Sequence, residues 1–320
     1  MSVEKVSVSD KIAIGEAHSK LILVGEHAVV HGQPAIAIPF PLIGVESIVE
    51  RVIGNVYLDS SFYQGPMESA PKSLAGIVNT IKHTLKILQI PYEDLLIRIK
   101  SSIPPGKGLG SSASVAVAVV KSLFKYSNVQ YTKEQLLQLV NISETYAHGA
   151  PSGIDSLTIT SKSPIWFKKE EPIDYITPNG EFYFVVADTG RMADTKTAIS
   201  TVKNMIKAAP QKVYGKIERI GEITYQAREA LEKSSKQLLG HLLNEAQKEL
   251  EAIGVSDHSL NNLIQFARQE GALGAKLTGG GNGGCIIALA QNEIHSKQLS
   301  EKLKQYGAHA VWPFTLKSVE

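Results

Sequence analysis

A glycine-rich stretch that runs into small apolar residues is the most restrictive feature of this 320-residue sequence. Pro104 to Ser114 reads PPGKGLGSSAS, with three alternating glycines and two adjacent serines, and Val115 to Val120 follows as VAVAVV. Glycine permits positive φ angles and a close approach between backbone and ligand. A helix N-terminus offers unpaired N–H groups and the positive end of the dipole. The stretch predicts a phosphate-binding loop before a buried helix, and a tight turn with a serine cap is the alternative.

Other phosphate-binding loops do not fit this stretch. No Gly-Lys-Ser/Thr closes a G-x-x-x-x-G frame, which excludes the P-loop of Ras-like proteins and ATPases. The glycine spacing also fails the dinucleotide fingerprint, and the H-R-D and D-F-G signatures of protein kinases are absent. The stretch resembles the second motif of the GHMP kinases, the family of galactokinase, homoserine kinase, mevalonate kinase and phosphomevalonate kinase. That motif reads roughly Pro-x-x-x-Gly-Leu-Gly-Ser-Ser-Ala.

A second motif lies between two apolar runs, 21–24 and 34–38, that predict short buried strands. The segment between them is a glycine-bounded loop that carries Glu26, His27 and His31, and loops of this kind often hold functional residues. The two histidines are four residues apart outside a helix, and no H-E-x-x-H is present. A hydrogen-bonding role is therefore favoured for each histidine over metal binding.

Together with Lys20, this segment resembles the first motif of the mevalonate kinase branch, Pro-Gly-Lys-x-Ile-Leu-x-Gly-Glu-His-Ala-Val-Val-x-Gly. Galactokinases carry a different opening, and homoserine kinases lack Gly-Glu-His-Ala-Val-Val. One departure is visible, because Ala17-His18-Ser19 stands where the family usually has Ala-Pro-Gly. The lysine itself is retained.

A carboxylate lies on the apolar face of the next predicted helix, which begins at a capping box formed by Thr132 and Gln135. Glu144 continues the apolar stripe of Leu136 and Val140, and it lies near the negative end of the helix dipole. A buried anion needs a partner, and Mg²⁺ takes hard oxygen ligands of this kind. Glu144 is therefore a candidate Mg²⁺ ligand, and a salt bridge or a rim position is the alternative.

The run from His148 to Asp155, HGAPSGID, resembles the His-Gly-x-Pro-Ser-Gly-Val/Ile-Asp run of mevalonate kinases. In that branch a glutamate and a loop serine hold Mg²⁺, and the aspartate faces the substrate hydroxyl. The resemblance implies Glu144 and Ser112 as metal ligands and Asp155 as the catalytic carboxylate. A helix-cap or turn role is the alternative for Asp155.

Two further segments lie in the C-terminal half. A Ser/Thr followed by Lys approaches the substrate in the family, which implies Thr195 as a substrate contact; capping by Asp194 or Thr195 is the alternative. Residues 276–284, KLTGGGNGG, also satisfy G-x-G-x-x-G, but the apolar run 286–289 predicts a strand where a dinucleotide fold needs a helix. These residues resemble the third GHMP motif, Lys-x-Thr-Gly-x-Gly-x-Gly-Gly.

Composition sets the broad class. Hydrophobic residues make up 43% and charged residues 20%, which supports packed cores. The net charge of +2 without a basic stripe argues against a nucleic-acid partner. The single cysteine, Cys285, excludes an intrachain disulfide and is expected to be a small core residue. No apolar run is long enough for a membrane span, and residues 1–20 lack the apolar core of a signal peptide, so a cytoplasmic protein is expected.

Hydrophobic periodicity predicts a mixture of helices and strands. Helices are expected at 73–88, 111–126, 213–233 and 235–253, and strands at 48–58, 95–99, 182–187, 286–289 and 307–316. The resemblance implies an α+β GHMP kinase fold with an N-terminal ribosomal-protein-S5-domain-2-like domain and a C-terminal ferredoxin-like domain. We place the division at 1–178 and 179–320, and the family also implies a homodimer.

The resemblance implies the activity of mevalonate kinases, transfer of the ATP γ-phosphate to the C5 hydroxyl of mevalonate with Mg²⁺. Asp155 and Lys20 are the expected catalytic residues, Ser112 and Glu144 the expected metal ligands. Glu26, His27 and Thr195 are expected to contact mevalonate. The expected phosphate-binding residues are Pro105, Gly106, Lys107, Gly108, Leu109, Gly110, Ser111 and Ser112.

Two alternatives stay open. Phosphomevalonate kinase has an acceptor that is already phosphorylated, so its site should supply extra Lys or Arg, and the sequence shows no such cluster beside Glu26 and His27. A non-catalytic nucleotide-binding regulator need not keep Lys20, Glu144 and Asp155 together.

Overall fold

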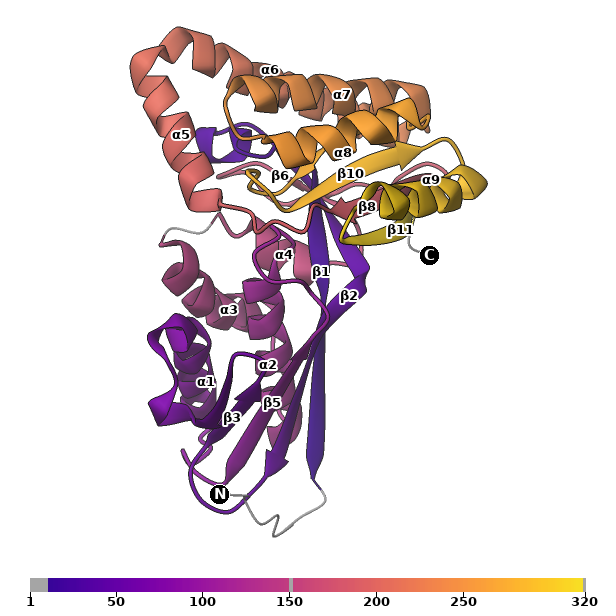
Figure 1. Cartoon of the computed structure of the whole chain (residues 1–320). Coiled ribbons are helices and arrows are strands. Elements are labelled where there is room, and N and C mark those ends of the chain that lie inside the picture. Colours follow the sequence, from indigo (N-terminus) through magenta and orange to yellow (C-terminus); the bar gives the residue numbers. More distant parts are fainter. Residues whose placement is uncertain (1–10, 150–151, 319–320) are drawn as a thin grey trace. The chain divides into compact units, whose positions relative to one another are not determined.

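The computed structural model describes residues 11–149 and 152–318, and these divide into two compact units (Figure 1). Unit 1 contains the residues up to Ser19, Ile43–Pro104 and Gly110–Thr160. Unit 2 contains Lys20–Leu42, Pro105–Leu109 and the residues from Ser161 onward. The chain therefore enters unit 2 three times, and the phosphate-loop stretch is divided after Leu109. The division at 178/179 expected from the sequence stays a prediction.

The sheet of unit 1 is built around β5 (Leu95–Ser101). β2 (Ala35–Arg51) pairs with it in antiparallel register from Val45↔Ser101 to Arg51↔Leu95, and β1 (Ile12–Val24) pairs with β2. On its other side β5 pairs in parallel with β3 (Tyr57–Ser60), which forms a hairpin with β4 (Tyr63–Pro66). The prediction of one strand at 48–58 is wrong, because the strand is interrupted in the middle. β2 ends at Arg51, and Gly54 turns the chain at φ 114°.

The helices of unit 1 gather around α2 (Ser111–Ser127), whose small residues are buried on most sides. α1 (Ala75–Ile87), α3 (Lys133–His148) and α4 (Ile154–Ile159) all pack against it. A Cβ on Gly15 of β1 would lie 2.2 Å from the Ala118 carbonyl oxygen, so this strand crosses α2 at backbone contact. Short 3₁₀ turns at Met67–Ser69 and Lys72–Leu74 complete the unit. From Ala116 to Val120 the run VAVAVV is fully buried, so the helix is a buried one, as the sequence predicts.

Unit 2 contains an antiparallel four-stranded sheet in the order β11-β8-β10-β9. Its strands are β8 (Phe182–Asp188), β9 (Gly274–Thr278), β10 (Cys285–Ala290) and β11 (Ala310–Leu316). The first part of β2 pairs with β6 (Ile165–Phe167), and β6 pairs with β7 (Asp174–Tyr175). The 3₁₀ turn η1 spans Ala28–His31. Cys285 is fully buried in β10, as expected.

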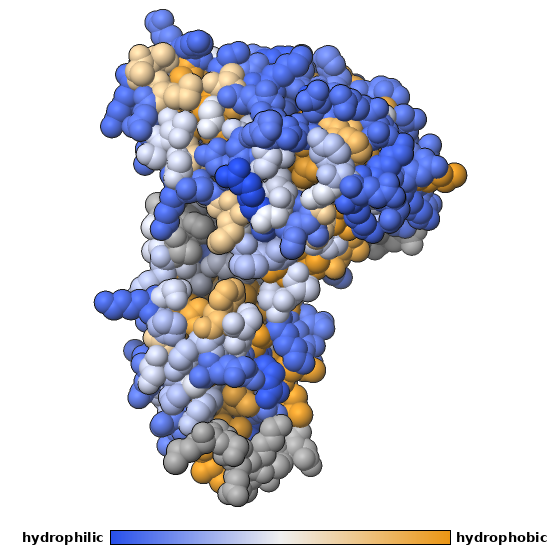
Figure 2. All heavy atoms as spheres, in the orientation of Figure 1, coloured by the Kyte–Doolittle hydropathy of each residue, from blue (hydrophilic) through white to orange (hydrophobic). Residues whose placement is uncertain are grey.

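Five helices accompany this sheet: α5 (Thr195–Ala208), α6 (Pro210–Glu232), α7 (Lys236–Ala252), α8 (His258–Gln269) and α9 (Glu293–Tyr306). α6 packs on α7, α7 and α8 contact β9, and α9 contacts β8, β10 and β11. The expected apolar stripe of α6, from Val213 to Leu231, is buried. Figure 2 shows a mostly hydrophilic outer surface over α7 and α8, as an amphipathic helix requires. In the described part of the chain, no helix is both long and apolar enough to cross a membrane.

The contact between α7 and β9 predicts opposite effects for two helical glycines. A Cβ on Gly240 of α7 would lie 2.6 Å from the backbone of Leu273, whereas nothing lies within 4 Å of a Cβ on the exposed Gly215 of α6. Gly240→Ala should lower the free energy of unfolding by about 2 kcal/mol or more because backbone must move. Gly215→Ala should raise it by about 0.5–1 kcal/mol. Urea unfolding of both variants checks this, and an unaffected Gly240→Ala protein would contradict the close packing.

Candidate active site

The first-motif strand and the third-motif strand are joined inside unit 2. Ile22 of β1 and Thr278 of β9 exchange two hydrogen bonds: the Ile22 N–H donates to Thr278 Oγ1 at 3.1 Å, and this hydroxyl donates to the Ile22 carbonyl oxygen at 2.9 Å. The Lys20 N–H donates to the Leu109 carbonyl oxygen at 3.3 Å. Segments from three separate parts of the sequence therefore meet at the end of β1.

A buried ion pair fixes the loop that follows β1. Lys276 of β9 donates to Glu26 Oε1, and the two side chains are 0% and 2% exposed. Burial raises the pKa of the Glu26 carboxyl group, which the Lys276 and Lys20 charges oppose, and burial lowers the pKa of the Lys276 ammonium group. Removing one partner of such a pair leaves a buried charge uncompensated. The structure thus gives Glu26 a role in holding its loop to β9, and its contact with mevalonate stays a prediction.

His27 lies next to this ion pair in a strained conformation, with φ 59° and ψ −39°. Its Nε2 donates to the Gly280 carbonyl oxygen at 2.9 Å, so in the neutral ring Nδ1 is the acceptor. Burial lowers the His27 pKa to about 4, and the bond to Gly280 only partly opposes this. His27 is therefore a neutral hydrogen-bonding group at pH 7. His31 instead packs its ring edge-on against Tyr214, at 6.0 Å between ring centroids.

Thr195 also lies against Gly280. A Cβ on Gly280 would be only 2.2 Å from Thr195 Oγ1, so the hydroxyl occupies the space that any larger residue would need. Thr195 is the first residue of α5, and Asp194 caps this helix by accepting from the Thr197 N–H at 2.9 Å. The capping role expected as an alternative is thus confirmed for Asp194. The structure brings Glu26, His27 and Thr195 together around the third glycine loop.

The N-terminal part of the phosphate loop, Pro105–Leu109, packs against the same third loop. Gly106 and Gly108 have φ angles of 66° and 75°, and a Cβ on Gly108 would lie 3.2 Å from the Gly279 Cα atom. The Ala193 N–H donates to the Gly106 carbonyl oxygen at 2.6 Å. These glycines are required by backbone conformation and by close approach. Their N–H groups are the ones expected to face phosphate.

The C-terminal part of this loop forms the start of α2 in unit 1. The N-cap is Gly110, with φ 76°, and no side chain caps the helix. The serine-cap alternative is therefore wrong, and the helix start keeps the donors that suit an anion. Ser114, one turn into the helix, donates instead to the His18 and Gly110 carbonyl oxygens at 2.8 and 3.0 Å. The departure Ala17-His18-Ser19 therefore lies in β1 beside this turn.

The remaining predicted site residues also belong to unit 1. Glu144 is on α3 and is 4% exposed, as its position on the apolar stripe predicts, and the capping box of Thr132 and Gln135 is present. Asp155 lies in the first turn of α4 and is half-buried. α3 and α4 contact each other and α2, the helix that carries Ser112. Ala150 and Pro151 of the predicted run lie outside the described residues.

Comparison with known proteins identifies the family. Residues 76–162 match the family described as GHMP kinases N terminal domain, and residues 227–309 match GHMP kinases C terminal. The mevalonate kinase of Pyrococcus abyssi is 31% identical over 300 residues, which cover 88% of this chain and 89% of that protein. The chain belongs to the GHMP kinase family. It is an ATP-dependent small-molecule kinase with the α+β fold predicted from its motifs.

Solved structures agree with this assignment. The GHMP kinase is similar to L. major mevalonate kinase, solved in complex with R-mevalonate, with 29% identity, a TM-score of 0.83 and 99% of each chain covered. It is also 32% identical to mevalonate kinase from methicillin-resistant Staphylococcus aureus MRSA252, with a TM-score of 0.73 and coverage of 95% of this chain and 98% of that one. The similarity therefore spans both units.

The donors expected for Mg²⁺ fit that ion chemically. Ser112 offers a hydroxyl oxygen and Glu144 a carboxylate, both hard ligands. Within the described ranges, no three His, Cys, Asp or Glu side chains gather as a metal cluster. Mg²⁺ in kinases is usually held by one or two carboxylates, substrate phosphates and water, so this small donor set suits the GHMP kinase.

Sequence reasoning missed two residues that shape the site. Lys276 and Asp188 form buried ion pairs with Glu26 and Lys107, respectively. Lys276 stands inside the third motif and Asp188 ends a predicted strand, but a local pattern gives no partner for a charge that is more than eighty residues away. A buried strand that contains one lysine, as β9 does, is the signal that could have indicated such a pair.

The environment of His27 predicts an unusual titration. Because the folded-state pKa of about 4 lies below the ordinary value of 6.5, protonation of the unfolded chain favours unfolding as the pH falls from 6.5 toward 4. His27→Gln should therefore lose less stability than the wild type between pH 7 and 5, by up to about 2 kcal/mol. NMR should show one imidazole signal that titrates near pH 4 and is missing from His27→Gln. The exposed His241→Gln protein is the control, and titration of His27 near 6.5 would contradict the buried, neutral ring.

Proposed function

We propose that this GHMP kinase phosphorylates the C5 hydroxyl of (R)-mevalonate with ATP, giving 5-phosphomevalonate and ADP. The similarity to mevalonate kinases over nearly the whole chain carries this proposal, including the L. major enzyme solved with R-mevalonate. The loop of Glu26 and His27 supports it, because these residues belong to the motif typical of that branch. The proposal places the enzyme in the mevalonate route to isoprenoids.

The phosphates are held by backbone donors. The N–H groups from Gly106 to Ser112, together with Pro105 and Leu109 that shape the loop, surround the β- and γ-phosphates. The positive φ angles of the glycines and the uncapped start of α2 support this role. Preorganised donors of this kind stabilise the charge that develops on the transferred group without needing to reorient.

Ser112 and Glu144 hold Mg²⁺, which when bound neutralises charge on the β- and γ-phosphates. Asp155 orients the C5 hydroxyl and accepts its proton as the oxygen–phosphorus bond forms and the bond from the γ-phosphorus to the ADP oxygen breaks. Lys20 favours the alkoxide form of the alcohol and offsets the charge that develops there. Catalysis is then mainly positioning and electrostatic stabilisation, as in other phosphoryl transfers.

Mevalonate is recognised by groups around Gly280. His27 accepts a hydrogen bond at its free Nδ1, because Nε2 is bonded to Gly280. Thr195 offers its hydroxyl beside the same glycine. The Lys276 ammonium group is already paired with Glu26, so it does not supply the additional cation that phosphomevalonate would need as the acceptor. A homodimer and a cytoplasmic location stay predictions.

An ADP-release assay tests the substrate. The purified enzyme with MgATP is offered mevalonate, phosphomevalonate, galactose or homoserine in parallel. Rapid ADP release with mevalonate alone is the expected result. Activity confined to a sugar or an amino acid would falsify the mevalonate assignment, and activity confined to phosphomevalonate would favour the alternative kinase. Binding of ATP without any turnover would indicate a regulator.

Asp155→Asn tests the proton acceptor. The amide keeps the size of the side chain but cannot take a proton, so kcat should fall by roughly 10²–10⁴-fold while the fold and ATP binding are retained. Steady-state kinetics and circular dichroism measure both. Asp174→Asn, a change at an exposed carboxylate of β7, is the control. Wild-type turnover by Asp155→Asn would remove this residue from the mechanism.

A further inference from the structure

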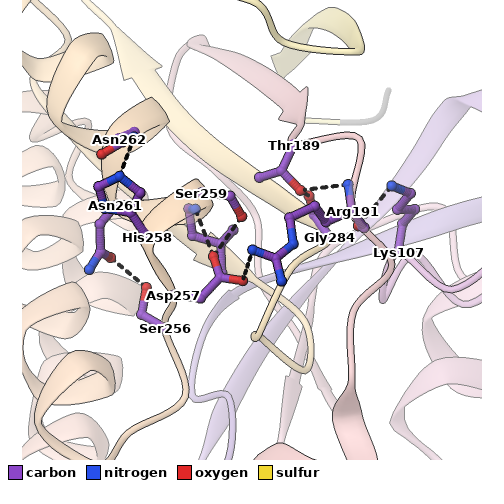
Figure 3. Close-up of polar contacts among 11 residues, drawn as sticks. Lys107, Thr189, Arg191, Ser256, Asp257, His258, Ser259, Asn261, Asn262 and Gly284 are labelled. Atoms are coloured by element: carbon purple, nitrogen blue, oxygen red, sulfur yellow. Dashed lines mark hydrogen bonds and ion pairs between the residues drawn. The ribbon is translucent and has the colours of Figure 1, made fainter.

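Lys107 is the only lysine within the glycine-rich loop, and a lysine in such a loop is ordinarily expected to contact phosphate. The structure gives its ammonium group other partners. Nζ lies 2.8 Å from Asp188 Oδ1 and donates to the Arg191 carbonyl oxygen at 2.8 Å, and the residue is only 6% exposed. Figure 3 shows the side chain directed toward the backbone of Arg191, close to Gly284. Its charge is thus directed into unit 2.

Asp188 is a rigid partner for this lysine. It ends β8, which lies between β10 and β11, and it is 0% exposed. Its Oδ1 also accepts from the Gly190 N–H at 2.9 Å, whereas Oδ2 is buried without a hydrogen-bond partner among the described residues. The carboxylate therefore depends on Lys107 for compensation of its charge.

The backbone around this ion pair holds the loop from several sides. The Arg191 carbonyl oxygen accepts from Lys107 Nζ and from the Gly284 N–H, the latter at 2.9 Å. Thr189 donates its N–H and its hydroxyl to the Gly284 carbonyl oxygen, at 3.0 and 2.8 Å. A Cβ on Gly284 would lie 3.0 Å from the Lys107 carbonyl oxygen. The glycine-rich loop, the 188–193 segment and the third glycine loop are therefore one hydrogen-bonded assembly within unit 2.

We propose that Lys107 is an anchor and not a phosphate ligand, and that Asp188 is the positioning residue that holds the ATP-binding loop through it. The role rests on the proposed binding of ATP phosphates by this loop. A loop with three glycines has many conformations when it is not held, and each must be lost when the phosphates bind. The ion pair restricts those conformations beforehand, so the backbone N–H groups already face the nucleotide.

The test uses three variants of the full chain: Lys107→Met, Asp188→Asn and the double variant. Kd for ATP is measured by displacement of a fluorescent ATP analogue at 25 °C, together with KM for ATP and for mevalonate, and Tm. Lys297→Met, which removes a partner from the exposed pair with Glu293, is the matched control. ATP binding by the wild type shows that the enzyme binds nucleotide, independently of the variants and of the acceptor.

We expect each single variant to weaken ATP binding by about tenfold or more and to lower Tm by roughly 6–12 °C, because one buried charge loses its partner. KM for mevalonate should change little. The double variant contains no unpaired charge, so it should regain most of the Tm and bind ATP within about threefold of the wild type. Lys297→Met should match the wild type.

Two results would overturn the proposal. A double variant that regains its Tm but binds ATP as weakly as Lys107→Met would make Lys107 a phosphate ligand. Single variants with lower Tm and unchanged ATP affinity would reduce the ion pair to a purely structural contact. In both cases the ADP-release assay on the wild type still decides the proposed function separately.

Lysine labelling on the unaltered enzyme keeps the proposal testable even if the single variants do not fold. Reductive methylation followed by mass spectrometry should leave Lys107 unmodified with and without ATP, while the exposed Lys297 reacts in both samples. Modification of Lys107 in the absence of ATP, and protection when ATP is added, would contradict the anchor.

Discussion

The close backbone packing of the third glycine loop is the constraint on which the unit 2 part of the site depends. A Cβ on Gly281 would lie 2.0 Å from the Val255 carbonyl oxygen, and one on Gly283 would lie 2.4 Å from that of Met192. Gly280 accepts a hydrogen bond from His27 at its carbonyl oxygen, and its lack of a side chain leaves room for the Thr195 hydroxyl. Side chains in this loop would force apart the very segments that supply donors and acceptors. The glycines of the third motif are therefore needed because they allow this close backbone packing.

Two buried ion pairs complement that packing. Glu26 with Lys276 and Lys107 with Asp188 each connect a motif loop to a strand of the second sheet. Burying charge costs several kcal/mol per ion, and the attraction between the partners only approximately offsets it. These ion pairs contribute conformational specificity, because the charge on each loop is compensated only when the loop is in one position. The first pair fixes the loop of His27, and the second fixes the glycine-rich loop whose N–H groups we propose to bind phosphate.

The elements that the sequence predicted well have strong local signals. The helix that starts at Ser111 and the capping box of Thr132 follow from small-residue runs and cap chemistry. The strand expected at 48–58 failed because alternation alone does not register the turn at Gly54. α8 and α9 were not predicted, although Asp257 and Asn292 cap them. Short amphipathic helices with many polar residues give a weaker periodic signal than a buried helix does.

The sequence by itself determined the family, the order of the motifs and the residue types of the phosphate loop, because glycine conformation and motif spacing are local properties. The apolar stripe of its helix also placed Glu144 on a buried face. Only the tertiary structure decided how the charges are paired. Lys107 and Asp188 are 81 residues apart and Glu26 and Lys276 are 250 apart. A charged side chain in a glycine loop can contact a ligand or a buried ion-pair partner. Only its burial and its distance to the partner distinguish these two cases.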